Sequence, residues 1–404
     1  MVLIEKFATV GLPSLAGRAS LAGVPLAWRN ILANKQRLLR SIAGIAFAVL
    51  LMMVEIGFRE GFIASMLVAI RQLDGEIMLV SSTRYQFGRE APFSRRQLSQ
   101  AHAVPGVASV RPLYAQRKAA VWKNPQTLGL VGVQIFAFDP DQPVFLIPEV
   151  TAKLDELRQP DTVMVDRRAR SNFGDVSSGT QTELSRHAMT VIGTFRLGPD
   201  FFTDGNVIMS DRTFFGLFAT GSANPADLPS PDVGVVRVLL GNQIADVQGA
   251  LRAALPANVA VLTKAELMDQ EARFALQVSP VGPIFDIGTL VGFAVGMLIS
   301  YQILFSDLSD QLSQYATLKA MGYRNAFLVK VVLQQAVLYA LLGYVPAWII
   351  CYFVFKTVGE MVLIPAGMSI GLTALSAALT LSMCIGSALI AVRRVIAADP
   401  AELF

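Results

Sequence analysis

The sequence predicts a membrane α-helical protein with four transmembrane helices and one large α+β domain outside the membrane. The 404-residue chain is 53% hydrophobic and only 16% charged, whereas soluble domains have about 25% charged residues. Four long segments are almost free of charge, and one polar stretch separates the first of them from the other three. Cys351 and Cys384 both fall inside apolar segments, far along the chain from His102 and His187, so these four residues cannot build a disulfide scaffold, a zinc finger or an iron–sulfur site.

Each apolar segment is long enough to cross a bilayer, which takes roughly 20 residues in a helix. We assign transmembrane helices to residues 41–63, 284–306, 331–355 and 369–392. The last apolar run starts earlier, but Pro365 and Gly367 interrupt it, so the helix is expected after them. Core helices of a large soluble enzyme are the alternative, and four nearly charge-free runs in one chain argue against it.

The distribution of charge predicts the orientation. Segments 1–40, 307–330 and 393–404 together contain 11 Lys+Arg and 5 Asp+Glu, whereas residues 64–283 contain 21 of each. The positive-inside rule places those three segments, with both termini, in the cytoplasm and exports 64–283. Positive charge beside the spans, instead of on one basic face, argues against nucleic acid as a partner. The N-terminal segment has a basic amphipathic helix at Pro25–Arg40 and is not a cleavable signal.

The exported domain shows a strand–helix–strand pattern at both ends. The expected elements are strand Glu76–Ser81, helix Ser94–His102 and strand Val107–Trp122, and later strand Val233–Leu240, helix Gln243–Ala254 and strand Asn258–Leu262. Two such halves can form one split sheet with helices on a face. We therefore assign 64–138 and 228–283 to this sheet, with a strand at Thr127–Phe138 after a turn at Asn124–Pro125. Residues 139–227 form an inserted lobe with strands at Thr162–Asp166, Ala188–Arg196 and Asn206–Ser210.

No residue pattern in this domain predicts catalysis. His102 and His187 lie near serines, but no spacing provides a nucleophile, a base and an orienting group. The chain has no GxxxxGK[ST] loop that could hold nucleotide phosphates. We expect a non-catalytic subunit with no cofactor or metal of its own, so a membrane-anchored enzyme is the weakest functional alternative.

Two patterns inside the spans suggest specific contacts. Gly288, Gly292 and Gly296 repeat every four residues and form a stripe where another helix backbone can approach closely. That helix belongs either to the same chain or to a second copy, and we favour a homodimer contact. Glu55 and Arg59 are also four residues apart, and we expect a membrane ion pair near the outer end of the first span.

The cytoplasmic segment after the second span predicts a contact with a cytosolic partner. Asp307–Met321 is rich in helix-forming residues, with Leu308, Leu312 and Tyr315 on one face. Gly322 is well placed to end that helix. A short helix that continues a span and stops at a glycine can transmit force from a partner protein.

These segments resemble those of the MacB/FtsX-like permeases of ABC systems, and the chain is most similar to the DevC type. The similar segments are PLAW (Pro25–Trp28), RLLRSIAGIAFA (Arg37–Ala48), GFRE (Gly57–Glu60), WKNP (Trp122–Pro125), DGNVIMSD (Asp204–Asp211), YQILFSDLSD (Tyr301–Asp310), YATLKAMGY (Tyr315–Tyr323) and ADPAELF (Ala398–Phe404). They extend over nearly the whole chain, and YATLKAMGY with the tail is the most specific part.

The resemblance implies a bacterial inner-membrane homodimer driven by a separate cytosolic ATPase that binds ATP and Mg. It also implies a periplasmic adaptor (membrane fusion protein) and a TolC-like outer-membrane channel. The exported domain would be periplasmic, with a ferredoxin-like porter part and an inserted β-rich lobe. The ATPase-coupling residues would be Asp307, Leu312, Tyr315, Ala316, Thr317, Leu318, Lys319, Ala320, Met321, Gly322 and Tyr323.

The chain departs from the family pattern at three positions. Gln311 and Gln314 stand where relatives often have a histidine and an acidic residue, and Glu55 stands where a glutamine is expected. Ion pairs with the ATPase at positions 311 and 314 are therefore not transferred to this chain, and no role for Glu55 is taken from the family.

Two functions remain after these arguments. The first is efflux of a lipid-like or hydrophobic substrate, with glycolipid, other lipid, peptide and drug-like cargo all open. The second is FtsX-like control of a periplasmic cell-wall hydrolase by the same movements.

Overall fold

The structure is a computed structural model of the chain, and it describes residues 35–218, 229–312, 317, 321–363 and 367–396. The chain divides into two compact units. The first, here called the membrane unit, comprises Met1–Met53, Thr289–Cys351 and Ile370–Phe404. The second, the outer unit, comprises Val54–Gly288 and Tyr352–Ser369.

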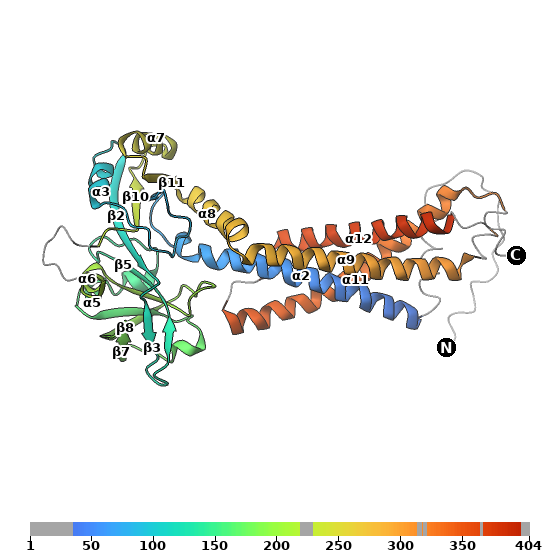
Figure 1. Cartoon of the computed structure of the whole chain (residues 1–404), viewed down its shortest axis with the longest axis horizontal. Helices are drawn as coiled ribbons and strands as arrows, with labels where there is room; N and C mark the ends of the chain where they lie inside the picture. The colour runs from blue at the N-terminus through green and yellow to red at the C-terminus, as the bar shows by residue number, and fades with distance from the viewer. Residues whose placement is uncertain (1–34, 219–228, 313–316, 318–320, 364–366, 397–404) are drawn as a thin grey trace, which may run out of the picture. The chain divides into compact units, whose positions relative to one another are not determined.

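Four helices in the described residues are long and apolar enough to cross a membrane. They are α2 (Lys35–Arg71), α9 (Val281–Asp310), α11 (Asn325–Val362) and α12 (Ile370–Ile396), labelled in Figure 1. Together with the α+β sheet domain of the outer unit, they confirm the predicted fold class. Helix α2 continues beyond the predicted residue 63 because Phe62, Met66 and Ile70 extend one apolar stripe at four-residue spacing.

The outer unit is built on one mixed sheet. Its strands are β1 (Ile77–Ser81), β2 (Val107–Gln116), β3 (Val121–Lys123), β4 (Leu130–Gly132), β5 (Gln134–Phe138), β6 (Thr162–Asp166), β7 (Gln181–Leu184), β8 (His187–Phe195), β9 (Asn206–Ser210), β10 (Val233–Val238) and β11 (Val259–Thr263). Its shorter helices are α3 (Arg95–His102), α4 (Pro148–Thr151), α5 (Leu154–Leu157), the 3-10 turn η1 (Ser171–Phe173), α6 (Asp211–Phe218), α7 (Ile244–Ala254), α8 (Lys264–Arg273) and the π-helix η3 (Phe274–Val278). The strand order is β11-β1-β10-β2-β5-β9-β6-β8-β7-β3-β4.

The first four strands of that order form a split βαβ sheet, here called the porter sheet. Strands β11, β1, β10 and β2 are all antiparallel to their neighbours, and α3 and α7 connect β1 to β2 and β10 to β11. This is the order of a ferredoxin-like sheet. Helices α3 and α7 lie next to each other and cover one face (Figure 1).

Strand β1 is buried on both faces of the porter sheet. Ile77 and Leu79 pack in the core beneath α3 and α7. Met78 and Val80 point to the opposite face, where they share a core with residues of α2 and α8. Successive side chains of a strand alternate between faces, so β1 serves both cores. The end of α2 therefore packs directly against this sheet.

The strands after Gln116 differ from the prediction. Instead of one strand to Trp122, β2 ends at Gln116, because Glu90 Oε1 accepts the backbone N–H groups of Arg117 and Lys118 at 2.8 and 3.0 Å. The predicted turn at Asn124 forms, and it joins the short strands β3 and β4.

The boundary between the porter part and the lobe also differs from the predicted residue 138. Strand β3 pairs with β4 and β7, and β5 pairs in parallel with β9. The chain between Val121 and Phe138 therefore belongs with the lobe strands. Among the named strands of the described residues, the pairing of β2 with β5 alone continues the sheet from one part into the other.

Candidate coupling site

A polar junction joins three helices of the membrane unit at the end of α9. Asp307 on α9 is buried, with 6% of its surface exposed. Its Oδ1 lies 2.7 Å from Nε of Arg37 on α2, and its Oδ2 accepts a 2.6 Å hydrogen bond from the hydroxyl of Tyr339 on α11. A buried carboxylate requires such partners, because breaking a buried pair costs about 3–5 kcal/mol. The junction therefore holds the end of α9 to α2 and α11.

Arg37 also contacts the neighbouring residues of α9. Its Nη2 donates a 2.8 Å hydrogen bond to Ser306 Oγ, and its Nη1 pairs with Asp310. The planar guanidinium can reach several acceptors at once, which a lysine ammonium at this position could not match. One side chain of α2 thus holds the last turn of α9, where the predicted coupling segment begins.

The predicted coupling residues lie partly within the described chain. Leu312 is half-buried, and Thr317 and Met321 are exposed. Gly322 has φ +93°, a left-handed conformation that glycine adopts without strain at a helix end. The Tyr323 ring lies 4.8 Å from that of Phe327 in α11. Tyr315, Ala316, Leu318, Lys319 and Ala320 lie outside the described residues, as do Gln314, most of Pro25–Arg40 and the tail segment ADPAELF.

Helices of the same chain pack closely against the glycine stripe, which was predicted as a site of helix packing within the chain or of a homodimer contact. In the outer unit, a Cβ on Gly288 would lie 2.6 Å from Cδ of Glu55. In the membrane unit, Cβ atoms on Gly292 and Gly296 would lie 3.0 Å from Met52 Cγ and 2.2 Å from Met383 Sδ. The stripe therefore serves close packing of α2 and α12 on α9.

The predicted ion pair between Glu55 and Arg59 is wrong. Arg59 Nε instead lies 3.2 Å from Asp286 Oδ1 on α9, and the described structure has no contact within 4.0 Å between Arg59 and Glu55. The Glu55 carboxylate points toward α9, into the space that a side chain at Gly288 would fill. Arg59 pairs with an acidic residue of the neighbouring helix instead of one on its own helix, because Asp286 of α9 lies beside it.

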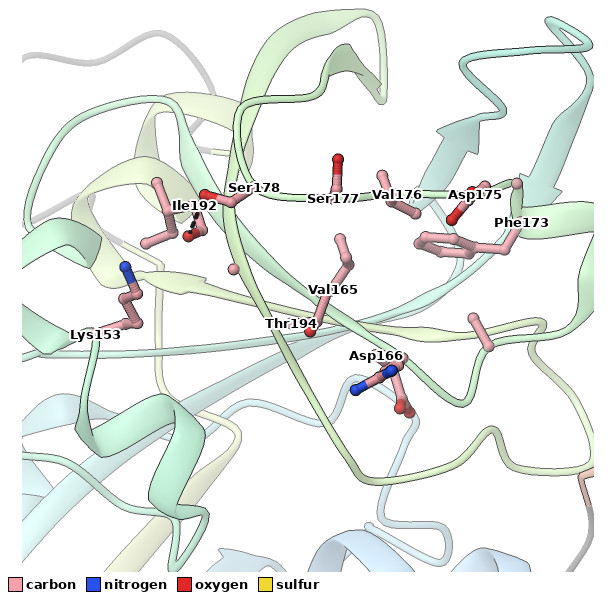
Figure 2. Close-up of a pocket in the computed structure, with 14 residues that line it drawn as sticks. Lys153, Val165, Asp166, Phe173, Asp175, Val176, Ser177, Ser178, Ile192 and Thr194 are labelled. Carbon is pink, nitrogen blue, oxygen red and sulfur yellow. Dashed lines mark hydrogen bonds between the residues drawn. The ribbon is translucent and has the colours of Figure 1, made fainter.

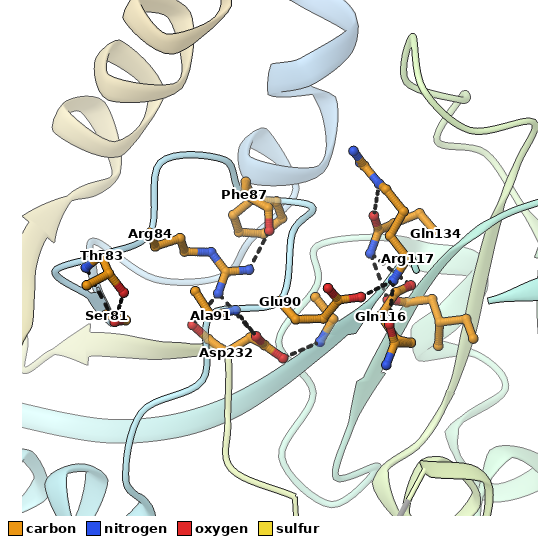
Figure 3. A network of polar contacts seen from close by, with 12 residues as sticks. Ser81, Thr83, Arg84, Phe87, Glu90, Ala91, Gln116, Arg117, Gln134 and Asp232 are labelled. Atoms are coloured by element: carbon orange, nitrogen blue, oxygen red, sulfur yellow. Dashed lines mark hydrogen bonds and ion pairs between the residues drawn. The ribbon is translucent and has the colours of Figure 1, made fainter. Parts of the chain in front are cut away.

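A buried polar network supports the loop that follows β1 (Figure 3). Arg84 donates to the carbonyl oxygen of Asp232 at 2.8 Å and to its carboxylate at 3.3 Å. The same carboxylate accepts backbone N–H groups of Ala91 and Ala115, each at 2.9 Å. Burial raises the pKa of Asp232 despite the neighbouring Arg84 guanidinium. These contacts fix the loop to β2 and β10.

Helix α8 is attached to the same loop through a buried acid. Glu271 accepts the backbone N–H of Phe87 at 2.8 Å, and Gln270 donates to the Arg84 carbonyl at 2.8 Å. Desolvation raises the pKa of Glu271 to about 7, although the Phe87 N–H, Arg84 and Arg117 favour the charged form. At its other end, α8 is tied to α2, because Lys264 Nζ donates to the carbonyls of Arg71 and Leu73, each at 2.8 Å.

The lobe contains a cavity of about 470 Å³ with mixed polar lining (Figure 2). The segment with Asp175, Ser177 and Ser178 lies on one side of it, and Lys153 approaches from the connection between α4 and α5. Its lining has no grouping of nucleophile, base and orienting residue. In the described residues, no three His, Cys, Asp or Glu side chains are grouped to hold a metal ion.

Two family models match the chain. The MacB-like periplasmic core domain matches residues 39–262, which is more than half of the sequence, and the FtsX-like permease C-terminal model matches 287–400. The chain belongs to the MacB/FtsX-like permease family. It is therefore a membrane subunit of an ABC transporter, and the sheet domain of the outer unit is its periplasmic domain. The segment 307–323 of this permease falls within the FtsX-like match.

Solved structures similar to this permease cover its periplasmic domain. The periplasmic region of MacB from Actinobacillus actinomycetemcomitans is 9% identical, with a TM-score of 0.34, and the match covers 49% of this chain and 92% of that one. The extracellular domain of the ABC-type transporter YknZ from Gram-positive bacteria is 11% identical, with a TM-score of 0.33 and coverage of 46% and 98%. A domain of a putative permease from Porphyromonas gingivalis is 14% identical, with a TM-score of 0.32 and coverage of 47% and 89%. No curated protein matches the chain.

Sequence reasoning missed three residues of this permease's polar contacts. Arg37 was one of six basic residues in the N-terminal segment, Tyr339 lies within the apolar run of α11, and Asp286 precedes a span. A phenol in an otherwise apolar run is a usable signal, because a buried hydroxyl needs a partner. Its partner Asp307 was predicted as a site residue, but for contact with the ATPase.

Proposed function

We propose that this permease is a non-catalytic mechanotransmission subunit. Two copies would bind a separate cytosolic ATPase, which holds ATP and Mg, through segment 307–323. Movement of that segment would reach the periplasmic domain through α2 and α9. The domain would then drive a lipid-like or hydrophobic substrate into a periplasmic adaptor and a TolC-like outer-membrane channel. Both termini would be cytoplasmic.

The observation that supports this proposal best is the junction of Arg37, Asp307 and Tyr339. It connects the start of the coupling segment to α2, which is one unbroken helix from Lys35 to Arg71. The far end of α2 contributes Leu67 and Ile70 to the core beneath the porter sheet. A displacement at Arg37 would therefore act on the same helix whose other end packs beneath the sheet.

The distribution of charge along the spans favours a substrate that does not cross the bilayer as a polar solute. The acidic and basic residues of α2, α9, α11 and α12 lie outside the runs 41–54, 287–306, 331–355 and 370–392, which contain no charge. A polar cargo that crossed between the helices would need ionisable or polar partners at mid-membrane depth. Uptake from the periplasm or the outer leaflet fits this pattern better.

The junction can be tested in the permease reconstituted in nanodiscs with its ATPase. We expect Arg37→Ala to lower permease-stimulated ATP hydrolysis by about 5-fold or more, the effect of losing ~1 kcal/mol of coupling. Tyr339→Phe removes one hydrogen bond to Asp307 and should give a smaller decrease. Arg40→Ala is the matched control, because Arg40 is exposed and contacts only the carbonyl of Gln36 among the described residues. Full stimulation by Arg37→Ala would refute the coupling role.

The partners can be tested by gentle purification of the tagged chain. Recovery of an ATPase together with a periplasmic adaptor supports export. Recovery of a cell-wall hydrolase in place of the adaptor would contradict the proposed export function. It would still agree with the proposed transmission of force from the ATPase to the periplasmic domain.

A further inference from the structure

The connection between β8 and β9 presents two aromatic rings beside the outer part of α2. Phe201 and Phe202 are 38% and 45% exposed. Their ring centroids lie 5.1 and 6.2 Å from that of Phe62 on α2, which is buried. The Phe62 ring also lies 6.4 Å from Phe285 on α9. We call Phe201 and Phe202 the aromatic tip.

The position of Phe62 along α2 sets the depth of this tip. From Ser41 to Phe58 the helix rises about 27 Å, which is close to the ~30 Å thickness of the hydrocarbon core. Arg59 follows and pairs with Asp286 at 3.2 Å. Charges are costly at the bilayer centre, so this ion pair marks the outer boundary of the hydrocarbon. Phe62 lies about one helical turn beyond Arg59, at the depth of the lipid headgroups.

The turn of α9 beside Phe62 lies at the edge of the span. Ile284 and Ile287 are 63% and 61% exposed, and the Asp286 side chain between them is 59% exposed. Apolar side chains on a spanning helix contact lipid when no other protein covers them. Apolar and charged side chains alternate on this turn, as expected where the hydrocarbon core meets the headgroups.

The tip is also held in place from behind. The Asp200 carboxylate accepts the backbone N–H of Phe202 at 2.9 Å and the hydroxyl of Thr203 at 2.8 Å, and it pairs with Arg117. The Arg117 guanidinium lies 5.6 Å from the centre of the Phe202 ring. Because these contacts fix the loop, the rings are presented in one orientation before any partner arrives.

We propose that Phe201 and Phe202 form a membrane-contact site, with their rings in the headgroup region of the outer leaflet. Phenylalanine, like tryptophan and leucine, inserts its apolar side chain at the boundary between headgroups and acyl chains when a membrane-bound segment presents it there. The partner is therefore bilayer lipid. This contact attaches the lobe to the membrane surface, and it does not depend on the transport function proposed above.

The depth of the tip can be measured with a nitroxide label in the full-length protein. Cys351 and Cys384 are both buried in spanning helices, so replacing both with alanine gives a background without reactive thiols. Phe202→Cys is labelled and placed in liposomes of phosphatidylethanolamine and phosphatidylglycerol. Collisions with oxygen, which partitions into lipid, are compared with collisions with a water-soluble nickel chelate.

Two matched labels calibrate the result. Ile287→Cys reports a lipid-facing position, and Leu240→Cys reports water, because Leu240 is fully exposed in the connection between β10 and α7. We expect the label at 202 to favour oxygen over nickel, as at 287 and opposite to 240. Equal behaviour at 202 and 240 would overturn the proposal. Shielding from both reagents would also overturn it, since a second copy or another protein would then cover the tip.

A tryptophan probe keeps an aromatic ring at the tip. Phe202→Trp is made with Trp28 and Trp348 replaced by phenylalanine, and Trp122 stays as a buried constant signal. Lipids brominated near the headgroup should quench Phe202→Trp at least twice as strongly as Leu240→Trp. Equal quenching of the two would contradict the lipid contact.

Discussion

Asp307 is a charged residue at the end of the apolar helix α9, and it is also the first residue of the predicted coupling segment. The structure gives its carboxylate two partners from other helices, Arg37 and Tyr339. The residue therefore acts within the chain as a positioning residue, and the exposed positions after it, such as Met321, are better placed to meet a partner protein.

At the residue scale, Glu271 predicts a pH dependence of stability. Its pKa is about 7 in the folded protein against 4.5 for an ordinary glutamate, so the folded state binds this proton more tightly than the unfolded chain. Stability should therefore fall as pH rises from about 4.5 to about 7. Glu271→Gln keeps an oxygen for the Phe87 N–H and removes the titration. Between pH 5 and pH 8, wild type should lose on the order of 2 kcal/mol relative to the variant.

The measurement is the Tm of the purified full-length protein across that pH range. Glu183→Gln provides a matched control, because Glu183 lies at the surface and pairs with Lys123. The control should follow the wild-type curve in parallel, while the Tm of Glu271→Gln changes less with pH. Parallel curves for all three proteins would show that Glu271 is not the group responsible.

Sequence reasoning at this scale singled out Asp307, for contact with the ATPase, and predicted a helix end at Gly322, whose φ is +93°. It could not identify Arg37 or Tyr339, since an ion pair between helices depends on how the helices are rotated and packed. The error at Glu55 and Arg59 has the same origin. The four-residue spacing along one helix made the Glu55–Arg59 pair possible. In the structure the Arg59 guanidinium pairs with Asp286 on α9 instead.

At the scale of elements, close packing of α9 depends on its glycines. A Cβ on Gly296 would lie 2.2 Å from Met383 Sδ and 3.0 Å from Ala48 Cβ. Met383 can rotate away, but Ala48 cannot. We expect Gly296→Ala to destabilise the protein by about 1–3 kcal/mol through overpacking, visible as a lower Tm in detergent.

Gly249→Ala tests whether that loss is specific. Gly249 is exposed on α7, and a Cβ there would meet no atom within 4 Å. Alanine is the better helix former, so this control should gain up to about 1 kcal/mol. A Gly296→Ala variant as stable as the control would contradict the packing of α12 and α2 on the stripe.

The elements of the porter sheet could be predicted because strand–helix–strand periodicity is a local property. Pairing between distant strands is not local, and Val121–Phe138 was therefore placed with the porter part when it pairs with the lobe. Helix α8 was missed although its start has a legible signal. Thr263 and Glu266 form a capping box, the S/T-x-x-E pattern that marks a helix N-terminus.

At the scale of the whole molecule, the proposed topology predicts where single cysteines can be labelled. In a background without Cys351 and Cys384, Leu240→Cys should react with a membrane-impermeant maleimide in intact spheroplasts. Met321→Cys, which is also exposed, should react only after lysis. The two variants are controls for each other, and the reverse pattern would overturn the assigned orientation.

The porter sheet also constrains how this protein is made. Strand β1 lies between β10 and β11, and its register with both is complete only when Val236 and Thr263 are in place. Both neighbouring strands, β10 and β11, follow the entire lobe in the sequence. Strand β1 is therefore translocated first and has two unpaired edges until they arrive. Unpaired edges attract other strands, and multidomain chains misassemble through such intermediates. We therefore expect β1 to be the strand of this sheet most exposed to mispairing until β11 has been translocated.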